Sequence, residues 1–223
     1  MSASVPESTA VPVDAPSAES SGPVTAAPPA RKRPRPGERR VQILQTLAGM
    51  LEQPGADRVT TAALAAKLEV SEAALYRHFA SKAQMFEGLI EFIEGSVFSL
   101  VNQIIEREGS GTAQAQKIVA VLLQFGERNP GMTRVMVGDA LVYENERLVA
   151  RMNQFFDRIE SSLRQVLRAA AEANGSSTPT VEANAQASVL VSFIIGRLQR
   201  YARSGFKRSP IEQMEAALRM LAR

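Results

Sequence analysis

VTTAALAAKLEVSEAALYRHFASK, residues 59–82, is the stretch that decides the fold of this chain. Thr60 and Thr61 can cap a helix, because their hydroxyls accept hydrogen bonds from the free N–H groups of the first turn. The Ala- and Leu-rich run that follows favours a helix, and Ser71 is a second cap residue. The pattern predicts two short helices joined by a tight turn, a helix-turn-helix over about residues 60–79.

The second of these helices carries side chains that suit contact with DNA. It begins with a serine that can donate or accept, a glutamate that can accept from a cytosine amine, and an alanine that can touch a thymine methyl. Farther along, Tyr76, His78 and Lys82 are donors at a spacing that could reach backbone phosphates. Ordinary core packing of a helical hairpin is the alternative, and His78 could equally be a partly buried structural residue. The predicted DNA-binding residues are Thr60, Thr61, Ser71, Glu72, Ala73, Tyr76, His78 and Lys82.

The span from about Arg39 to Val97 resembles the DNA-binding domain of the TetR family of bacterial regulators. The shared pattern is a Thr-rich start, a helix of small residues, Val-Ser at the turn and Tyr-x-x-Phe-x-Ser-Lys at the exit. One departure is Glu69, where the family usually has glycine. A non-glycine residue with positive φ costs on the order of 1 kcal/mol, so this turn is either slightly strained or differently shaped.

The resemblance continues beyond the DNA-binding domain. The runs MFEGLIEFIEGSV (85–97), FGERNPGMTRVMVGDAL (125–141) and ENERLVARMNQFFDRIESSLRQVLR (144–168) are similar to one branch of the family. Members of that branch bind DNA and the tubulin-like division protein FtsZ at once, and so block assembly of the division ring over the chromosome. This similarity implies the same two partners for the present chain.

The segment GERNPG, residues 126–131, ends a predicted helix. Its Pro-Gly pair stops the helix, and Arg128 and Asn129 are expected to be exposed at the helix end. A cation there is a plausible contact for an acidic peptide tail, although the segment could also be only a loop between helices.

The same branch places its FtsZ-binding groove between the fourth and fifth helices. The matching residues here are Phe92, Arg128 and Asn129, and the resemblance implies that they contact FtsZ, including its C-terminal tail. Leu100 and Gln124 depart from the cation and the glycine expected in that groove. The affinity for FtsZ, or the set of residues that contact it, is therefore expected to differ from that of the branch.

Composition excludes several classes of protein. The chain has 223 residues, 45% of them hydrophobic, which suffices for one or two helical domains with a sizeable core. It has no cysteine and one histidine, so it has no disulfide framework, thiolate nucleophile or multi-histidine metal site. There is no Gly-rich phosphate loop or paired-carboxylate motif either. We therefore predict no catalytic residues, no metal and no cofactor, and hence no enzyme.

Neither a signal peptide nor an apolar run of about 18 residues is evident, so no membrane insertion is expected. The absence of cysteine suits a reducing compartment. The predicted location is the cytoplasm, in association with the nucleoid.

The N-terminal 36 residues read as a tail rich in Ser, Ala and Pro with a basic end. Residues 1–30 carry a charge of −3, which leaves +6 for the rest of a chain whose total is +3. Their composition predicts disorder. The basic end, RKRPRP at 31–36, could lie along DNA phosphates as a flexible arm, or could only aid solubility.

The remaining pattern is helical throughout, so the predicted fold class is all-α with about nine helices. Residues 37–82 form the three-helix DNA-binding domain, and 83–223 form a helical regulatory and dimerisation domain. In the first helix, about 37–52, the predicted apolar stripe is Val41, Leu44, Leu47, Ala48 and Leu51. The later helices are predicted at 82–105, 112–129, 131–141, 144–173, 181–204 and 211–221.

Two features of the second domain predict a homodimer. The 144–173 helix has an apolar seam at helical spacing, and the 181–204 helix has small residues three and four apart that permit close approach of another backbone. Together they predict a four-helix contact between two subunits; a crossing within one subunit is the alternative. A two-fold dimer presents two reading helices about one DNA turn apart, which implies a palindromic site. The sequence is compatible with either one dimer or two dimers on one DNA site. The seam is Leu148, Met152, Phe155, Phe156, Ile159, Leu163, Val166 and Leu167, and the small residues are Ala185, Ser188, Ser192 and Gly196.

Two functions are compatible with these patterns. The branch resemblance favours a DNA-activated inhibitor of FtsZ assembly. The alternative is a ligand-responsive transcriptional repressor, the usual role in the TetR family, which requires an apolar pocket in the second domain.

Overall fold

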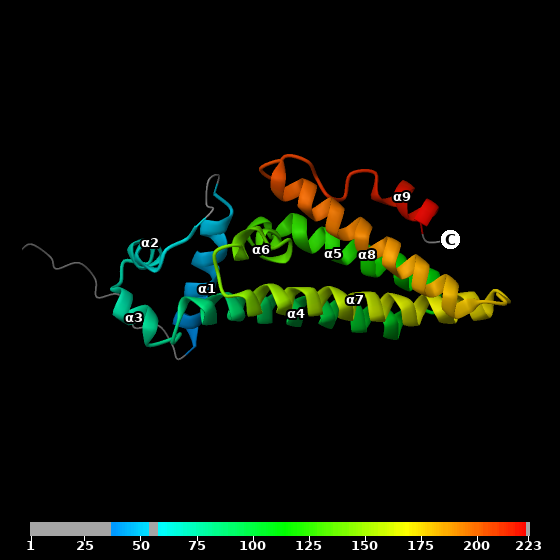
Figure 1. The fold of residues 1–223 in the computed structure, drawn as a ribbon, viewed down its shortest axis with the longest axis horizontal. Coiled ribbons are helices and arrows are strands. Elements are labelled where there is room, and N and C mark those ends of the chain that lie inside the picture. The colour runs from blue at the N-terminus through cyan, green and yellow to red at the C-terminus, as the bar shows by residue number, and fades with distance from the viewer. Residues whose placement is uncertain (1–36, 54–57, 222–223) are drawn as a thin grey trace, which may run out of the picture. The chain divides into compact units, whose positions relative to one another are not determined.

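The computed structural model describes residues 37–53 and 58–221, and within these ranges the chain is helical with no strand (Figure 1). The predicted all-α class is confirmed. The predicted tail at 1–36 and most of the break before the helix-turn-helix lie outside the described residues. The elements are α1 Glu38–Leu51, α2 Thr61–Lys67, α3 Glu72–Tyr76, α4 Lys82–Arg107, α5 Gly111–Arg128, α6 Pro130–Met136, the 3-10 helix η1 Asp139–Leu141, α7 Glu146–Ala173, α8 Pro179–Arg203 and α9 Met214–Leu221.

Helix α1 packs against α2, α4 and α6 through one face. That face is centred on Ile43, Leu47 and Leu51, each 1% exposed. The predicted stripe was wrong at Val41, which is 54% exposed. With 3.6 residues per turn, Val41 lies about a third of a turn away from the centre of the buried face.

Helix α4 is the long element that follows the helix-turn-helix. Ser81 caps it by accepting a hydrogen bond from the backbone N of Gln84 at 3.2 Å. By length and composition, α4 is the one helix in the described ranges that could cross a membrane, with a mean hydropathy of 1.3. One face of it is buried in the protein core, however: Met85, Ile90 and Ile93 are fully buried, and α4 packs on α1, α5 and α7.

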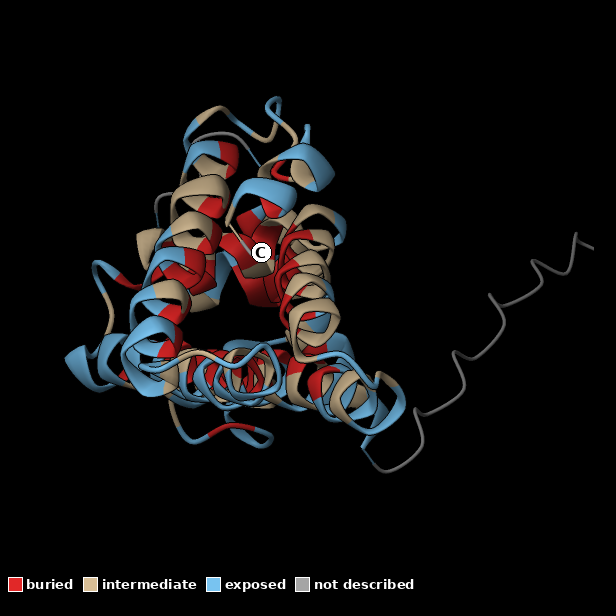
Figure 2. Ribbon diagram, turned by 90° about the vertical axis from the view of Figure 1, so that its right-hand side faces the viewer, coloured by how far each residue is buried: buried red, intermediate tan, exposed pale blue. Residues whose placement is uncertain are grey.

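The apolar seam of α7 is buried inside a single chain. Phe155 and Leu148 are 0% exposed, and α7 packs on α8, α5 and α4. Viewed from the end, the buried residues face inward and the exposed ones outward (Figure 2). The predicted role of this seam between subunits was therefore wrong, because helical periodicity identifies a buried face without identifying the chain that covers it.

The predicted helix at 131–141 is two elements. Gly138 adopts a left-handed conformation, φ 85°, and separates α6 from η1. At the other end of α6, Gly131 lies so close to α1 that a Cβ added to it would be 2.0 Å from the backbone oxygen of Ala48. The absence of a side chain at Gly131 thus allows α1 and α6 to meet backbone to backbone.

Candidate DNA-binding and partner-binding surfaces

The predicted caps of the helix-turn-helix are present. Thr60 Oγ1 accepts from the backbone N of Ala63 at 3.1 Å, and Ser71 Oγ accepts from that of Ala74 at 3.3 Å. Glu69, in the turn, has φ 55°. Of the two shapes predicted for this turn, the structure has the left-handed one, which carries strain for a residue with a Cβ.

The start of α3 presents an open polar face. Ser71, Glu72 and Ala73 are exposed, while Leu75 and Phe79 anchor the helix from its other side at 1% and 2% exposure. A face of this kind can approach the edges of base pairs.

One contact within this face was not predicted from sequence. Thr61 Oγ1 donates a hydrogen bond of 2.6 Å to Glu72 Oε2, across the turn between α2 and α3. The contact orients the carboxylate and leaves its other oxygen available. Two further predicted residues are exposed, Tyr76 at the end of α3 and His78 just after it, so His78 is not the partly buried structural residue considered above.

Lys82 is in a different state from the other predicted DNA-binding residues. Its ammonium group forms an ion pair with Glu144, and it lies 5.6 Å from the centroid of the Phe86 ring. The Lys82 side chain is 23% exposed and that of Glu144 is 10% exposed. The structure therefore holds this cation against the segment before α7 and away from bulk solvent.

Further ion pairs join the N-terminal halves of α4 and α7. Arg147 pairs with Glu87 at 2.8 Å, and Arg151 pairs with Glu94 at 2.7 Å and with Glu91 at 3.8 Å. The side-chain hydrogen bond to Glu94 raises the pKa of Arg151 above its usual value. These contacts attach the helix behind the DNA-reading unit to the second domain.

Helices α4 and α5 form an antiparallel hairpin. Their connection, residues 108–110, is fixed by Gln114 Nε2, which donates to the backbone oxygens of Ile105 at 3.0 Å and Glu108 at 2.6 Å. In such a hairpin, residues equally far from the connection are neighbours. Phe92 on α4 therefore falls opposite the C-terminal end of α5.

The three residues predicted to contact FtsZ lie around that end of the hairpin. Phe92 is 52% exposed and Arg128 is exposed at the last turn of α5. Asn129 follows, and its Nδ2 donates to the backbone oxygen of Phe125 at 2.8 Å. Leu100, farther along α4, is 41% exposed. Phe92, Leu100 and Arg128 are thus an aromatic ring, an apolar side chain and a cation that are each exposed on this hairpin.

The stripe of small residues on α8 faces outward. Ala185, Ser188 and Ser192 are exposed, Val189 beside them is 48% exposed, and no atom lies within 4 Å of a Cβ added at Gly196. Unlike the α7 seam, this stripe is open in the single chain and accessible to another helix.

The three-helix reading unit followed by an all-helical domain defines a TetR-type DNA-binding regulator. The model of "Bacterial regulatory proteins, tetR family" matches residues 43–89. The fold is also similar to a solved structure, the transcriptional regulator FadR from Bacillus subtilis in complex with stearoyl-CoA. That likeness has a TM-score of 0.65 at 12% identity, and covers 82% of this chain and 97% of that one.

The second domain narrows the assignment. Residues 111–223 match the SlmA-like model of "Tetracyclin repressor-like, C-terminal domain". The nucleoid occlusion factor SlmA of Vibrio vulnificus is 52% identical over 178 residues, 79% of this chain and 90% of the relative. That of Escherichia coli O81 is 49% identical over 194 residues, 86% and 98%.

The chain belongs to the SlmA family of nucleoid occlusion factors. The resemblance identified from sequence is thereby confirmed. The relatives of this chain are DNA-binding regulators, which are not enzymes.

Proposed function

We propose that this nucleoid occlusion factor acts as a homodimer that binds palindromic chromosomal DNA and, when DNA-bound, inhibits assembly of FtsZ into the division ring. The observation that carries the proposal is the presence, in one chain, of an exposed reading helix and of an exposed aromatic and cationic surface on α4 and α5. Such a protein would work in the cytoplasm, on the nucleoid.

On the DNA side, α3 enters the major groove. Its exposed first turn, Ser71 to Ala73, contacts base edges, and Thr60, Thr61, Tyr76 and His78 contact the backbone. Lys82 also contacts the DNA backbone once its ion pair with Glu144 is broken. A second copy packs against the small-residue stripe of α8, which gives the two-fold symmetry that a palindromic site requires.

On the FtsZ side, the ring of Phe92 supplies an apolar anchor and Arg128 a cation for a carboxylate-bearing peptide. Asn129 has its side chain fixed by the α5 backbone, so that it is pre-ordered for a partner. An extended segment such as the C-terminal tail of FtsZ suits this combination. Leu100 replaces a cation with an apolar side chain, which favours a more apolar footprint.

The alternative, a ligand-responsive repressor, has less support. The FadR structure holds stearoyl-CoA, a ligand with a long apolar chain. In the described part of the present chain, a pocket of about 550 Å³ is open and has several arginine and polar side chains in its lining. An apolar effector would need an enclosed apolar chamber instead.

The test combines DNA selection with a sedimentation assay of FtsZ polymers. Selection from randomised duplexes gives the cognate site, and FtsZ polymers are then pelleted with the protein alone and with the protein plus that duplex. We expect loss of polymer mainly when the duplex is present. Unchanged polymer in both conditions would refute the proposal.

Phe92→Ala should abolish the loss of polymer while DNA binding is kept. Val149→Ala is the matched control, because Val149 is a 39% exposed apolar residue on α7, outside the proposed surface.

A further inference from the structure

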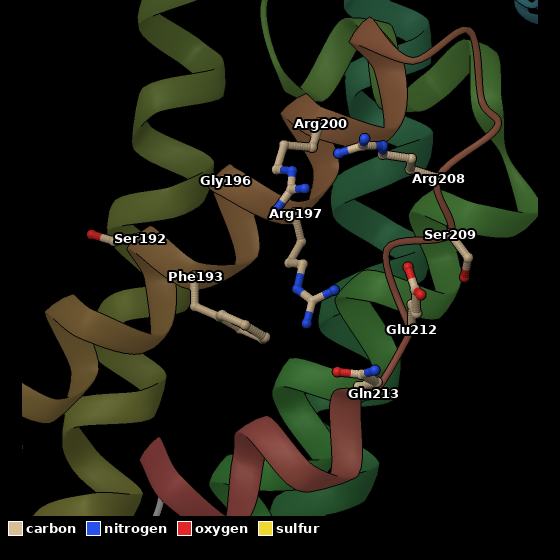
Figure 3. Close-up of a pocket in the computed structure, with 9 residues that line it drawn as sticks. All are labelled: Ser192, Phe193, Gly196, Arg197, Arg200, Arg208, Ser209, Glu212 and Gln213. Atoms are coloured by element: carbon tan, nitrogen blue, oxygen red, sulfur yellow. The ribbon is translucent and has the colours of Figure 1, made fainter.

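A pocket of about 550 Å³ lies between the C-terminal half of α8 and the segment that connects α8 to α9 (Figure 3). Three arginines line it: Arg197 and Arg200 from α8, and Arg208 from the connecting segment. In Figure 3, the side chains of Arg200 and Arg208 approach each other at one end, and that of Arg197 extends toward the other end. The pocket is thus strongly cationic.

The arginines have no acidic partner within the described residues. None of the three forms an ion pair there, even though Glu212 lines the same pocket, whereas Arg147 and Arg151 on α7 are paired. Three guanidinium groups in one concave site repel one another. A bound anion would relieve that repulsion, and paired N–H groups of arginine match the oxygens of a phosphate.

The wall that carries Arg208 is held by specific contacts. Ser204 Oγ accepts hydrogen bonds from two backbone N–H groups, including that of Arg208 at 2.9 Å. Phe206 has φ 63° and packs edge-on against Tyr201, with ring centroids 5.2 Å apart. Gln213, in the pocket lining, has φ 52°. Unfavourable backbone conformations at two non-glycine residues indicate a wall whose shape is fixed by its surroundings.

The other end of the pocket offers a surface for a planar ring. The guanidinium of Arg197 lies 5.0 Å from the centroid of the Phe193 ring, and Glu212 and Gln213 supply an acceptor and an amide nearby (Figure 3). Stacked planar groups beside hydrogen-bonding side chains are suited to a nucleobase.

We propose that this pocket binds a nucleoside diphosphate or triphosphate. The phosphates contact Arg200 and Arg208, and the base lies at the Phe193 and Arg197 end, within reach of Glu212 and Gln213. The pocket volume falls in the range of small-molecule sites. The lining of this pocket shares no residue with the surfaces proposed above to contact DNA and FtsZ.

The pocket also borders the small-residue stripe of α8, because Ser192 and Gly196 belong to both. A second copy that packs on this stripe would cover part of the open side of the pocket. It could instead place a carboxylate of its own against the arginines, and the test below includes that outcome.

The test is calorimetric titration of the full-length protein with GDP, ADP and pyrophosphate at low salt. We expect saturable binding of a nucleotide that is tighter than that of pyrophosphate. Arg200→Ala and Arg208→Ala should each weaken it about tenfold or more, the loss that corresponds to one charge-assisted hydrogen bond. Arg208→Lys should also weaken nucleotide binding, since lysine keeps the charge but lacks the paired N–H groups of the guanidinium.

Arg203→Ala is the matched control, because Arg203 is an exposed arginine in the last turn of α8 that does not line the pocket. An equal loss of binding in this variant would show diffuse charge attraction and overturn the proposal. The proposal would also be overturned if nucleotide bound no more tightly than pyrophosphate. It would equally be overturned if no nucleotide bound to a protein whose helical content and DNA binding are intact. A change in the monomer–dimer equilibrium of the Arg200 and Arg208 variants, with nucleotide binding unaltered, would assign the arginines to the partner subunit instead.

Discussion

Replacement of Glu144 by glutamine is expected to strengthen DNA binding, because Glu144 competes with DNA phosphates for the ammonium group of Lys82. At 4 Å, two unit charges attract by about 1 kcal/mol in bulk water and about 4 kcal/mol at a typical effective protein dielectric. The pair is only partly shielded, at 23% and 10% exposure. After desolvation is discounted, a net attraction of about 1 kcal/mol per protomer is reasonable. Its release corresponds to roughly fivefold in affinity per protomer and about 25-fold for a dimer.

The assay is fluorescence anisotropy of a labelled cognate duplex over a range of salt concentrations. Each phosphate newly contacted by a lysine steepens the slope of log affinity against log salt by about 0.9, so Glu144→Gln should steepen it by about 1.8 per dimer. Glu146→Gln removes the same charge two residues away, from an exposed glutamate that forms no ion pair with another described residue. If both variants strengthened binding equally, or if the slope of Glu144→Gln matched that of the unaltered protein, the competition would be refuted.

Three further predictions concern backbone and packing. Glu69→Gly should relieve left-handed strain and raise the free energy of unfolding by up to about 1 kcal/mol in chemical denaturation, with DNA affinity unchanged; a lower value would contradict the strain. Gly131→Ala should destabilise by about 2 kcal/mol or more, since its Cβ would meet an α1 backbone oxygen at 2.0 Å, whereas Gly49→Ala, with open space at that position, should not; equal effects would count against the close approach. Gly196→Gln should shift the protein toward monomer in sedimentation, and Gly95→Gln, at an equally open glycine on α4, should leave it unchanged; a stable Gly196→Gln dimer would exclude the α8 stripe.

Features that depend on nearby residues were predictable from the sequence. The caps at Thr60 and Ser71 need a hydroxyl and a backbone N–H three residues later, so the pattern of residues alone locates them. At Glu69 the glycine of the family motif left two alternatives, a strained left-handed turn or a turn of another shape, and the structure has the first.

Features that depend on distant residues were not predictable. Lys82 and Glu144 are 62 positions apart, and no local pattern associates them. The apolar period of α7 was recognised, but its partners α5 and α8 in the same chain were not. Gly138 was visible in the sequence, yet a glycine within a helical pattern is compatible with either a continuous helix or a break.

The close approach at Gly131 has a consequence for the choice of DNA site. The described residues belong to one compact unit. In it, α1 of the DNA-binding domain contacts α6 at Gly131 with no side chain between the two backbones. In a two-fold dimer, this stiffness would fix the distance between the two reading helices along the DNA. One extra base pair between the half-sites would rotate the second by roughly 35° and move it out of reach, so the number of central base pairs would matter as much as their identity.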